Sequence, residues 1–133
     1  MSLAEYTETG NWNNLNESVV LNTGEIYSIK YLNTLRTGGV LESITILAGR
    51  FNYLNSTNSI TNFGNIAILD ANDNFIQLGQ GCNGPITAVT VTNSPAINCT
   101  SNFCSTIIAV GKFDKCYLAS YFYNFSHIFI FTI

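Results

Sequence analysis

The amino-acid sequence predicts an all-β protein, a single antiparallel β-sandwich or jelly-roll-like domain of about 8–10 short strands. Asn, Thr and Ser number 18, 14 and 11, and these residues favour turns and strands over helices. Short apolar or alternating runs recur along the chain with turn residues between them, and no helical periodicity intervenes. The length of 133 residues suits one domain, so residues 1–133 are expected to form one all-β unit.

The first half of the chain contains five runs that are expected to be strands. Those at 26–32 and 40–48 alternate imperfectly, as in strands with one face on the core and the other toward polar surroundings. Turn residues Asn22-Thr23-Gly24 and Thr37-Gly38-Gly39 precede these two runs. The five predicted strands are 18–21, 26–32, 40–48, 51–54 and 66–69.

The second half adds strands at 75–80, 86–92, 106–110, 117–123 and 128–133. Asn83-Gly84 tolerates the positive φ of a tight turn, which predicts that 75–80 and 86–92 pair as an antiparallel hairpin. The turn at 71–74 predicts a similar hairpin for the strands beside it. The polar stretch 94–105 is expected to be a long loop.

The last predicted strand is apolar on both faces. Such a strand must be central in a covered sheet or covered by another chain, because exposure would make it a template for aggregation. We expect one edge to be internal to the subunit and the other to be contacted by a partner. The residues of this assembly strand are Ile128, Phe129, Ile130, Phe131 and Ile133.

Composition excludes several classes of protein. Charged residues make up only 10% of the chain and the net charge is -3, so the surface is mostly amide and hydroxyl. The five Lys and Arg residues are scattered, which excludes a phosphate-binding surface and hence nucleic acid as a partner. No apolar run is long enough for a membrane-spanning helix, and no signal peptide is recognised in this chain. A charge-poor surface suits an extracellular protein or a virion component.

The sequence offers no constellation for catalysis, so we expect a protein that is not an enzyme, with no catalytic residue and no cofactor. The single imidazole, His127, lies at the head of the apolar final strand, where a general base is not expected. Asp70 and Asp73 are close in sequence, but Phe75 and Gly81 stand where a calcium loop needs Gly and Glu. We interpret these Asp residues as turn formers and expect no metal site.

Four cysteines, Cys82, Cys99, Cys104 and Cys116, are candidates for disulfides. An even number in an extracellular β-domain favours a disulfide framework, and reduced, buried cysteines are the alternative in a cytosolic protein. Of the three connectivities we favour Cys82 with Cys99 and Cys104 with Cys116, because each pair closes a local loop.

Asn16, Asn55 and Asn98 are candidate glycosylation sites, and Asn124 is a less suitable one because apolar strands flank it. Four sequons are close to the number that chance gives in a chain so rich in Asn, Ser and Thr. They are therefore compatible with glycosylation without indicating it. Asn55 is expected in a loop.

These observations predict a non-enzymatic structural assembly protein, such as a virion component or an extracellular filament or surface subunit. Its partners would be copies of itself, packed through uncharged polar and apolar β surfaces. The alternative is a carbohydrate-binding lectin or adhesin module. In that case Trp12, Asn13 and Tyr53 would contact the glycan, because an aromatic face can stack on a sugar while amides bind its hydroxyls.

Overall fold

The computed structural model describes residues 4–6, 12–14, 20–21, 24–36, 38–56, 59–93, 105–120, 123 and 125–133. Every regular element in these ranges is a strand, which confirms the predicted all-β class. No helix in the described ranges has the length and apolar character needed to cross a membrane.

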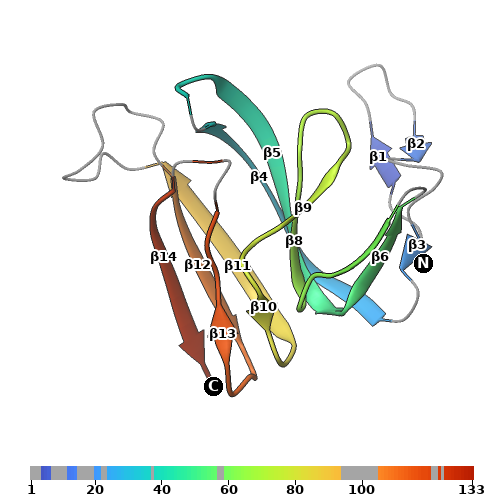
Figure 1. The fold of residues 1–133 in the computed structure, drawn as a ribbon, viewed down its shortest axis with the longest axis vertical. Coiled ribbons are helices and arrows are strands. Elements are labelled where there is room, and N and C mark those ends of the chain that lie inside the picture. The colour runs from blue at the N-terminus through green and yellow to red at the C-terminus, as the bar shows by residue number, and fades with distance from the viewer. Residues whose placement is uncertain are drawn as a thin grey trace.

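The described residues form fourteen strands, which group into two larger and three smaller sheets (Figure 1). The strands are β1 (Ala4–Tyr6), β2 (Trp12–Asn14), β3 (Val20–Leu21), β4 (Gly24–Leu35), β5 (Leu41–Phe51), β6 (Tyr53–Ser56), β7 (Ser59–Asn62), β8 (Ile66–Leu69), β9 (Phe75–Gln77), β10 (Gly81–Cys82), β11 (Ile86–Asn93), β12 (Ser105–Gly111), β13 (Cys116–Tyr117) and β14 (Phe125–Thr132).

The larger sheets are the β4 sheet, with strand order β4-β5-β8-β9, and the β14 sheet, with order β11-β12-β14. The smaller ones are β1-β2, β3-β6-β7 and β10-β13. The five sheets stay separate and none of them closes on itself, so the predicted single jelly roll is not what these pairings describe.

The long hairpin of β4 and β5 dominates the β4 sheet, as Figure 1 shows. Gly38 and Gly39, with φ of 110° and 91°, lie in its turn, where residues with a Cβ would be strained. A bulge between Ile26 and Ser28 leaves Tyr27 as the extra residue. Ile26 therefore packs on one face of the β4 sheet and Leu32 on the other, although both positions are even.

The core lies between the inner faces of the β4 and β14 sheets. Ile44, Ile46 and Ala48 alternate along β5 and point inward, which is the period-2 pattern of a strand. Ile66 and Ile68 of β8 lie beside them in the same sheet, and residues from β11 and β12 face them. Ile128 and Ile130 of β14 pack against the same cluster. The other fully or nearly buried members are Leu32, Ile66, Ile68, Leu78, Cys82, Ile86, Val89, Ile107, Ala109, Leu118 and Tyr123.

A second apolar cluster lies on the opposite face of the β4 sheet. Leu47 and Ala67 point there from β5 and β8, and Phe51 and Phe63 pack with them. This arrangement explains the imperfect alternation of 40–48, because β5 is buried on both faces over its second half.

The predicted hairpin between 75–80 and 86–92 is wrong, although the one across 71–74 is confirmed by the pairing of β8 with β9. Asn83-Gly84 instead lies against the turn at 112–115. The Asn83 Oδ1 accepts hydrogen bonds from the backbone N–H groups of Asp114 and Lys115, at 2.9 Å each. These long-range hydrogen bonds of Asn83 replace the predicted tight turn. The chain instead passes from β10 into β11 of the β14 sheet.

The pairing of β14 with β12 is parallel, which departs from the predicted wholly antiparallel arrangement. Between these strands the chain makes the 112–115 turn and pairs β13 with β10, so it returns to the end where β12 began. For this reason the strand predicted at 117–123 is wrong: β13 ends at Tyr117, and residues 118–120 are not in a strand. Ser105, the last residue of the predicted loop 94–105, instead begins β12, and 94–104 lie outside the described residues.

Candidate functional site

The C-terminal strand β14 divides its apolar side chains between two faces. Ile128 and Ile130 are half-buried against the core. Phe129, Phe131 and Ile133 are exposed by 45%, 55% and 78%. Ile128 and Ile130 therefore lie on the core face, and Phe129, Phe131 and Ile133 lie open on the described surface. The predicted contact of one strand edge with a partner stays a prediction.

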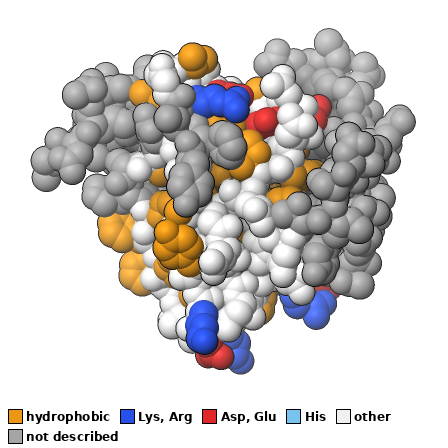
Figure 2. All heavy atoms as spheres, viewed as in Figure 1, with side chains coloured by type: hydrophobic (Ala, Val, Ile, Leu, Met, Phe, Trp, Pro, Cys, Tyr) orange, Lys and Arg blue, Asp and Glu red, His pale blue; other side chains and the backbone are white. Residues whose placement is uncertain are grey.

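The exposed side of β14 continues onto β12. The parallel register pairs Ile108 with Phe129 and Val110 with Phe131, so these four side chains share what we call the outer β14 face. Ile108 and Val110 are half-buried. In Figure 2, hydrophobic side chains gather where Figure 1 places β14, with the Lys, Arg, Asp and Glu side chains of that view above and below them.

The three strands of the β14 sheet contain no Asp, Glu, Lys or Arg. The β4 sheet differs, since Glu25, Lys30, Glu42 and Arg50 lie on its strands. Charges on edge strands are a usual protection against association with other sheets. The β14 sheet lacks that protection.

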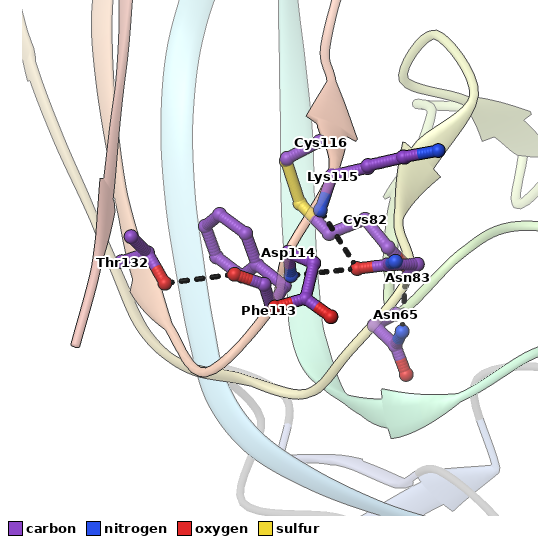
Figure 3. Close-up of a disulfide and its surroundings, with 8 residues drawn as sticks. All are labelled: Asn65, Cys82, Asn83, Phe113, Asp114, Lys115, Cys116 and Thr132. Atoms are coloured by element: carbon purple, nitrogen blue, oxygen red, sulfur yellow. Dashed lines mark hydrogen bonds between the residues drawn. A yellow bond between two sulfur atoms is a disulfide. The ribbon is translucent and has the colours of Figure 1, made fainter.

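The edge of β14 that faces away from β12 has no strand partner in the described part of the chain. The Ile133 N–H donates to the Gly111 carbonyl at 2.9 Å, so Ile133 is bonded toward β12. By alternation along a parallel strand, the N–H groups of Ile130 and Thr132 point to the other edge. The Thr132 hydroxyl is held by the Phe113 carbonyl at 2.8 Å (Figure 3).

A disulfide joins Cys82 of β10 to Cys116 of β13 (Figure 3). The favoured pairing of Cys82 with Cys99 and of Cys104 with Cys116 is therefore wrong, and Cys99 and Cys104 lie outside the described residues. Cys82 and Cys116 face each other across the antiparallel pair. The N–H of Cys82 donates to Gly64 instead of crossing to Cys116, so this is a non-hydrogen-bonded position, where side chains approach most closely. The register of the β10–β13 pair, and not the length of the closed loop, therefore determines which cysteines form this bond.

A polar pocket of about 540 Å³ opens beside this disulfide. We call it the disulfide pocket; its lining includes Asn52, Asn62, Gln80, Asn83, Lys115 and Tyr117. Tyr117 is 58% exposed. No local pattern in the sequence indicates this site, because its residues come from four separate segments and its amides resemble the many other Asn and Gln residues of the chain.

The backbone that supports the disulfide pocket is fixed by close contacts. Gly81 has a φ of 71°, and a Cβ on it would lie 2.6 Å from the Gly64 Cα, so only glycine fits there. Behind the pocket, buried Asn65 accepts a hydrogen bond from the Phe51 N–H at 2.9 Å. Its Nδ2 donates to the Cys82 carbonyl at 2.8 Å (Figure 3).

The aspartates at 70 and 73 form the predicted turn. Asp70 Oδ1 accepts hydrogen bonds from the N–H groups of Asn72 and Asn74 at 2.9 and 2.8 Å, and Asp73 has a left-handed φ of 63°. These bonds show how Asp70 shapes the turn between β8 and β9. Within the described residues, no three His, Cys, Asp or Glu side chains group closely enough to hold a metal ion.

Three buried polar atoms, Thr34 Oγ1, Glu42 Oε2 and Tyr123 OH, have no hydrogen-bond partner among the described residues. Thr34 and Glu42 are cross-strand neighbours, and Arg36 forms an ion pair with Glu42 at 3.4 Å and a backbone bridge with Tyr123. Burial raises the pKa of the Tyr123 phenol well above its ordinary 10.0, and the Glu42 carboxylate raises it further.

Several predicted site residues lie outside what the structure describes. Asn16, Asn98 and Asn124 fall in undescribed segments. The backbones of Trp12 and Asn13 lie in β2, that of Tyr53 in β6 and that of His127 in β14, without described side chains.

The expectation that Asn55 lies in a loop is wrong. It is in β6, paired with Ile60 of β7 and Val20 of β3.

No protein-family model, curated protein or solved structure matches this chain.

Proposed function

We propose that this protein is a non-enzymatic structural subunit that assembles with copies of itself through the β14 sheet. The observation that carries the proposal is the position of β14, an edge strand with exposed Phe131 and Ile133 and no charged side chain on its sheet. A virion component or an extracellular filament or surface subunit would use such a surface.

A second copy of the chain is the occupant that best suits this edge. An antiparallel pair formed by two identical edge strands is self-complementary about a two-fold axis, so one surface serves both partners. Pairing β14 with β14 of a second copy would join two three-stranded sheets into one of six strands. No like charges would be brought together, because the β14 sheet has no Asp, Glu, Lys or Arg.

The apolar side chains of the outer β14 face would lie beside the new pair. Burying a side chain of this size stabilises by about 1.5–3 kcal/mol, so two copies of Phe131 alone would contribute several kcal/mol before the cost of association. The two-fold pair is the smallest unit of the assembly. A particle or filament needs a further contact, for which Val40 and Leu41 are exposed beside the turn of the β4–β5 hairpin.

Sedimentation velocity of the wild-type chain tests the proposal, with Phe131→Lys as the disrupting variant. We expect a dimer or larger species for the wild type and a folded monomer for the variant, because a charge at this edge opposes pairing. Tyr31→Lys is the matched control, since Tyr31 is 67% exposed on the other sheet, and it should leave the β14 pair intact. A monomeric wild type across a wide range of concentrations would overturn the proposal.

The backbone can be tested separately from the side chains. Thr132→Pro removes an N–H that points to the free edge, while Thr132→Ala loses the same hydroxyl bond to Phe113 and keeps the N–H. We expect only the proline variant to weaken the dimer by more than about tenfold in Kd, since a bridge between strands needs that donor. Equal dissociation by the two variants would rule out edge pairing.

A further inference from the structure

We propose that the disulfide pocket binds a pyranose sugar that carries a carboxylate, such as a sialic or uronic acid. The pocket lies beside β10 and β13 and is distinct from the outer β14 face and from Trp12, Asn13 and Tyr53. Its lining combines an exposed aromatic ring, several side-chain amides and one cation, and each of these matches a part of such a sugar.

Tyr117 supplies the apolar surface of the pocket. Its cross-strand partner is Gly81, which has no side chain to cover the ring, and Tyr117 is 58% exposed. An aromatic ring that is open on one face can stack on the C–H face of a pyranose, and its hydroxyl can bond the sugar edge. A tyrosine needed only for packing would be covered.

The amides supply donors and acceptors for hydroxyl groups. Asn52 and Gln80 are exposed, and their side-chain amides form no hydrogen bond within the described part of the chain. Asn83 Oδ1 is occupied by Asp114 and Lys115 N–H groups, which fixes the amide so that its Nδ2 remains a donor. The Asn52 and Gln80 amides can each donate and accept, as a vicinal diol requires, whereas Asn83 offers its Nδ2 as a donor.

Lys115 determines which sugar is favoured. It is the one charged residue in the lining, and no Asp or Glu lines the pocket to neutralise it. Figure 3 shows its side chain extending away from the disulfide. A carboxylate on the ligand would pair with this ammonium group, whereas a neutral sugar would leave it unused.

The pocket is also held in shape before any ligand arrives. The Cys82–Cys116 disulfide ties its two strands, and the contact of Gly64 with Gly81 fixes its floor. The Asn83 bonds fix the turn that carries Lys115. A preformed polar pocket loses little conformational freedom on binding, which is what a small polar ligand needs.

Titration of the ¹⁵N-labelled protein with sialyllactose and with lactose tests the inference. We expect sialyllactose to bind at least several-fold more tightly than lactose, with shifts confined to residues around Gln80, Asn83 and Tyr117. Lys115→Ala should remove the difference between the two sugars. Absence of shifts with both sugars at millimolar concentration would overturn the proposal, as would shifts confined to other residues.

Variants separate stacking from hydrogen bonding. Tyr117→Ala should weaken sialyllactose binding by about tenfold or more, because a central aromatic contact usually dominates a small site. Gln80→Ala should weaken it less and leaves the strand pairing intact. Tyr31→Ala is the matched control, an exposed tyrosine outside the pocket. Undiminished binding by a folded Tyr117→Ala chain would refute the site, and the oligomeric state of these variants should stay that of the wild type.

Discussion

The hydroxyl of Ser28 on β4 bonds both backbone groups of Val89 on β11. It donates to the Val89 carbonyl and accepts from the Val89 N–H, at 3.2 Å each. These strands are the facing edges of the two larger sheets, and no ladder joins them in the described residues. The Ser28 hydroxyl thus bonds two backbone groups on the edge of β11 that a neighbouring strand would bond in a continuous sheet.

Replacing Ser28 with alanine should lower the free energy of unfolding by about 1–2 kcal/mol, because two partly buried backbone groups lose their partner. Ser43→Ala is a suitable control, since its hydroxyl bonds the exposed Asn33 side chain. Urea unfolding of both variants measures the difference. Equal stability of the two would show that water replaces the Ser28 bonds without cost.

The Cys82–Cys116 disulfide should contribute about 4 kcal/mol of stability in the chain-entropy model, given a sequence separation of 34. A Cys82→Ala, Cys116→Ala double variant should therefore melt on the order of 10 °C lower than the wild type. The unreduced, denatured wild type should show no more than two free thiols. Four thiols would contradict the bridge.

Asn65 should be among the most sensitive polar positions. Alanine there would leave the buried Phe51 N–H and Cys82 carbonyl without their hydrogen bonds to Asn65. It would also have to adopt a φ of 73°, which asparagine tolerates better than alanine. We expect a loss of about 2–4 kcal/mol, measured by chemical denaturation. Asn33→Ala, at an exposed position, should cost less than about 1 kcal/mol.

The raised pKa of Tyr123 predicts how the stability of the protein changes in alkaline solution. Its pKa is raised in the folded state, so the neutral phenol is favoured by folding. The corresponding stability is fully present below the unfolded pKa of about 10 and is lost as the pH rises toward the folded pKa. Tyr123→Phe should reduce the fall in stability above pH 10. It should cost little at neutral pH, because the hydroxyl has no hydrogen-bond partner among the described residues.

Local pattern predicted several strands well. The continuous apolar run at 66–69 forms β8. The runs at 26–32 and 40–48 fall largely in β4 and β5, with Gly38 and Gly39 in the turn between them. Pairings that depend on residues far apart in the sequence could not be predicted from local pattern. The role of Asn83 depends on a turn some thirty residues later, and the Cys82–Cys116 pair depends on register that no local spacing encodes.

Of the two candidate surfaces, the one on β14 could be predicted from local pattern and the disulfide pocket could not. The apolar content of 128–133 indicated that β14 must be covered, and its alternate residues do divide between core and surface. The disulfide pocket could not be predicted, because Tyr117 and Gln80 meet only through the β10–β13 pairing.

The disulfide also divides the β14 sheet by covalent topology. The ring that it closes includes β11 and β12, whereas β14 follows Cys116 and lies outside the ring. The first two strands are therefore tethered to the β10–β13 pair even when the sheet opens, while β14 is attached by a single connection. In the proposed assembly, exchange of β14 between neighbouring copies would therefore leave the Cys82–Cys116 bond intact.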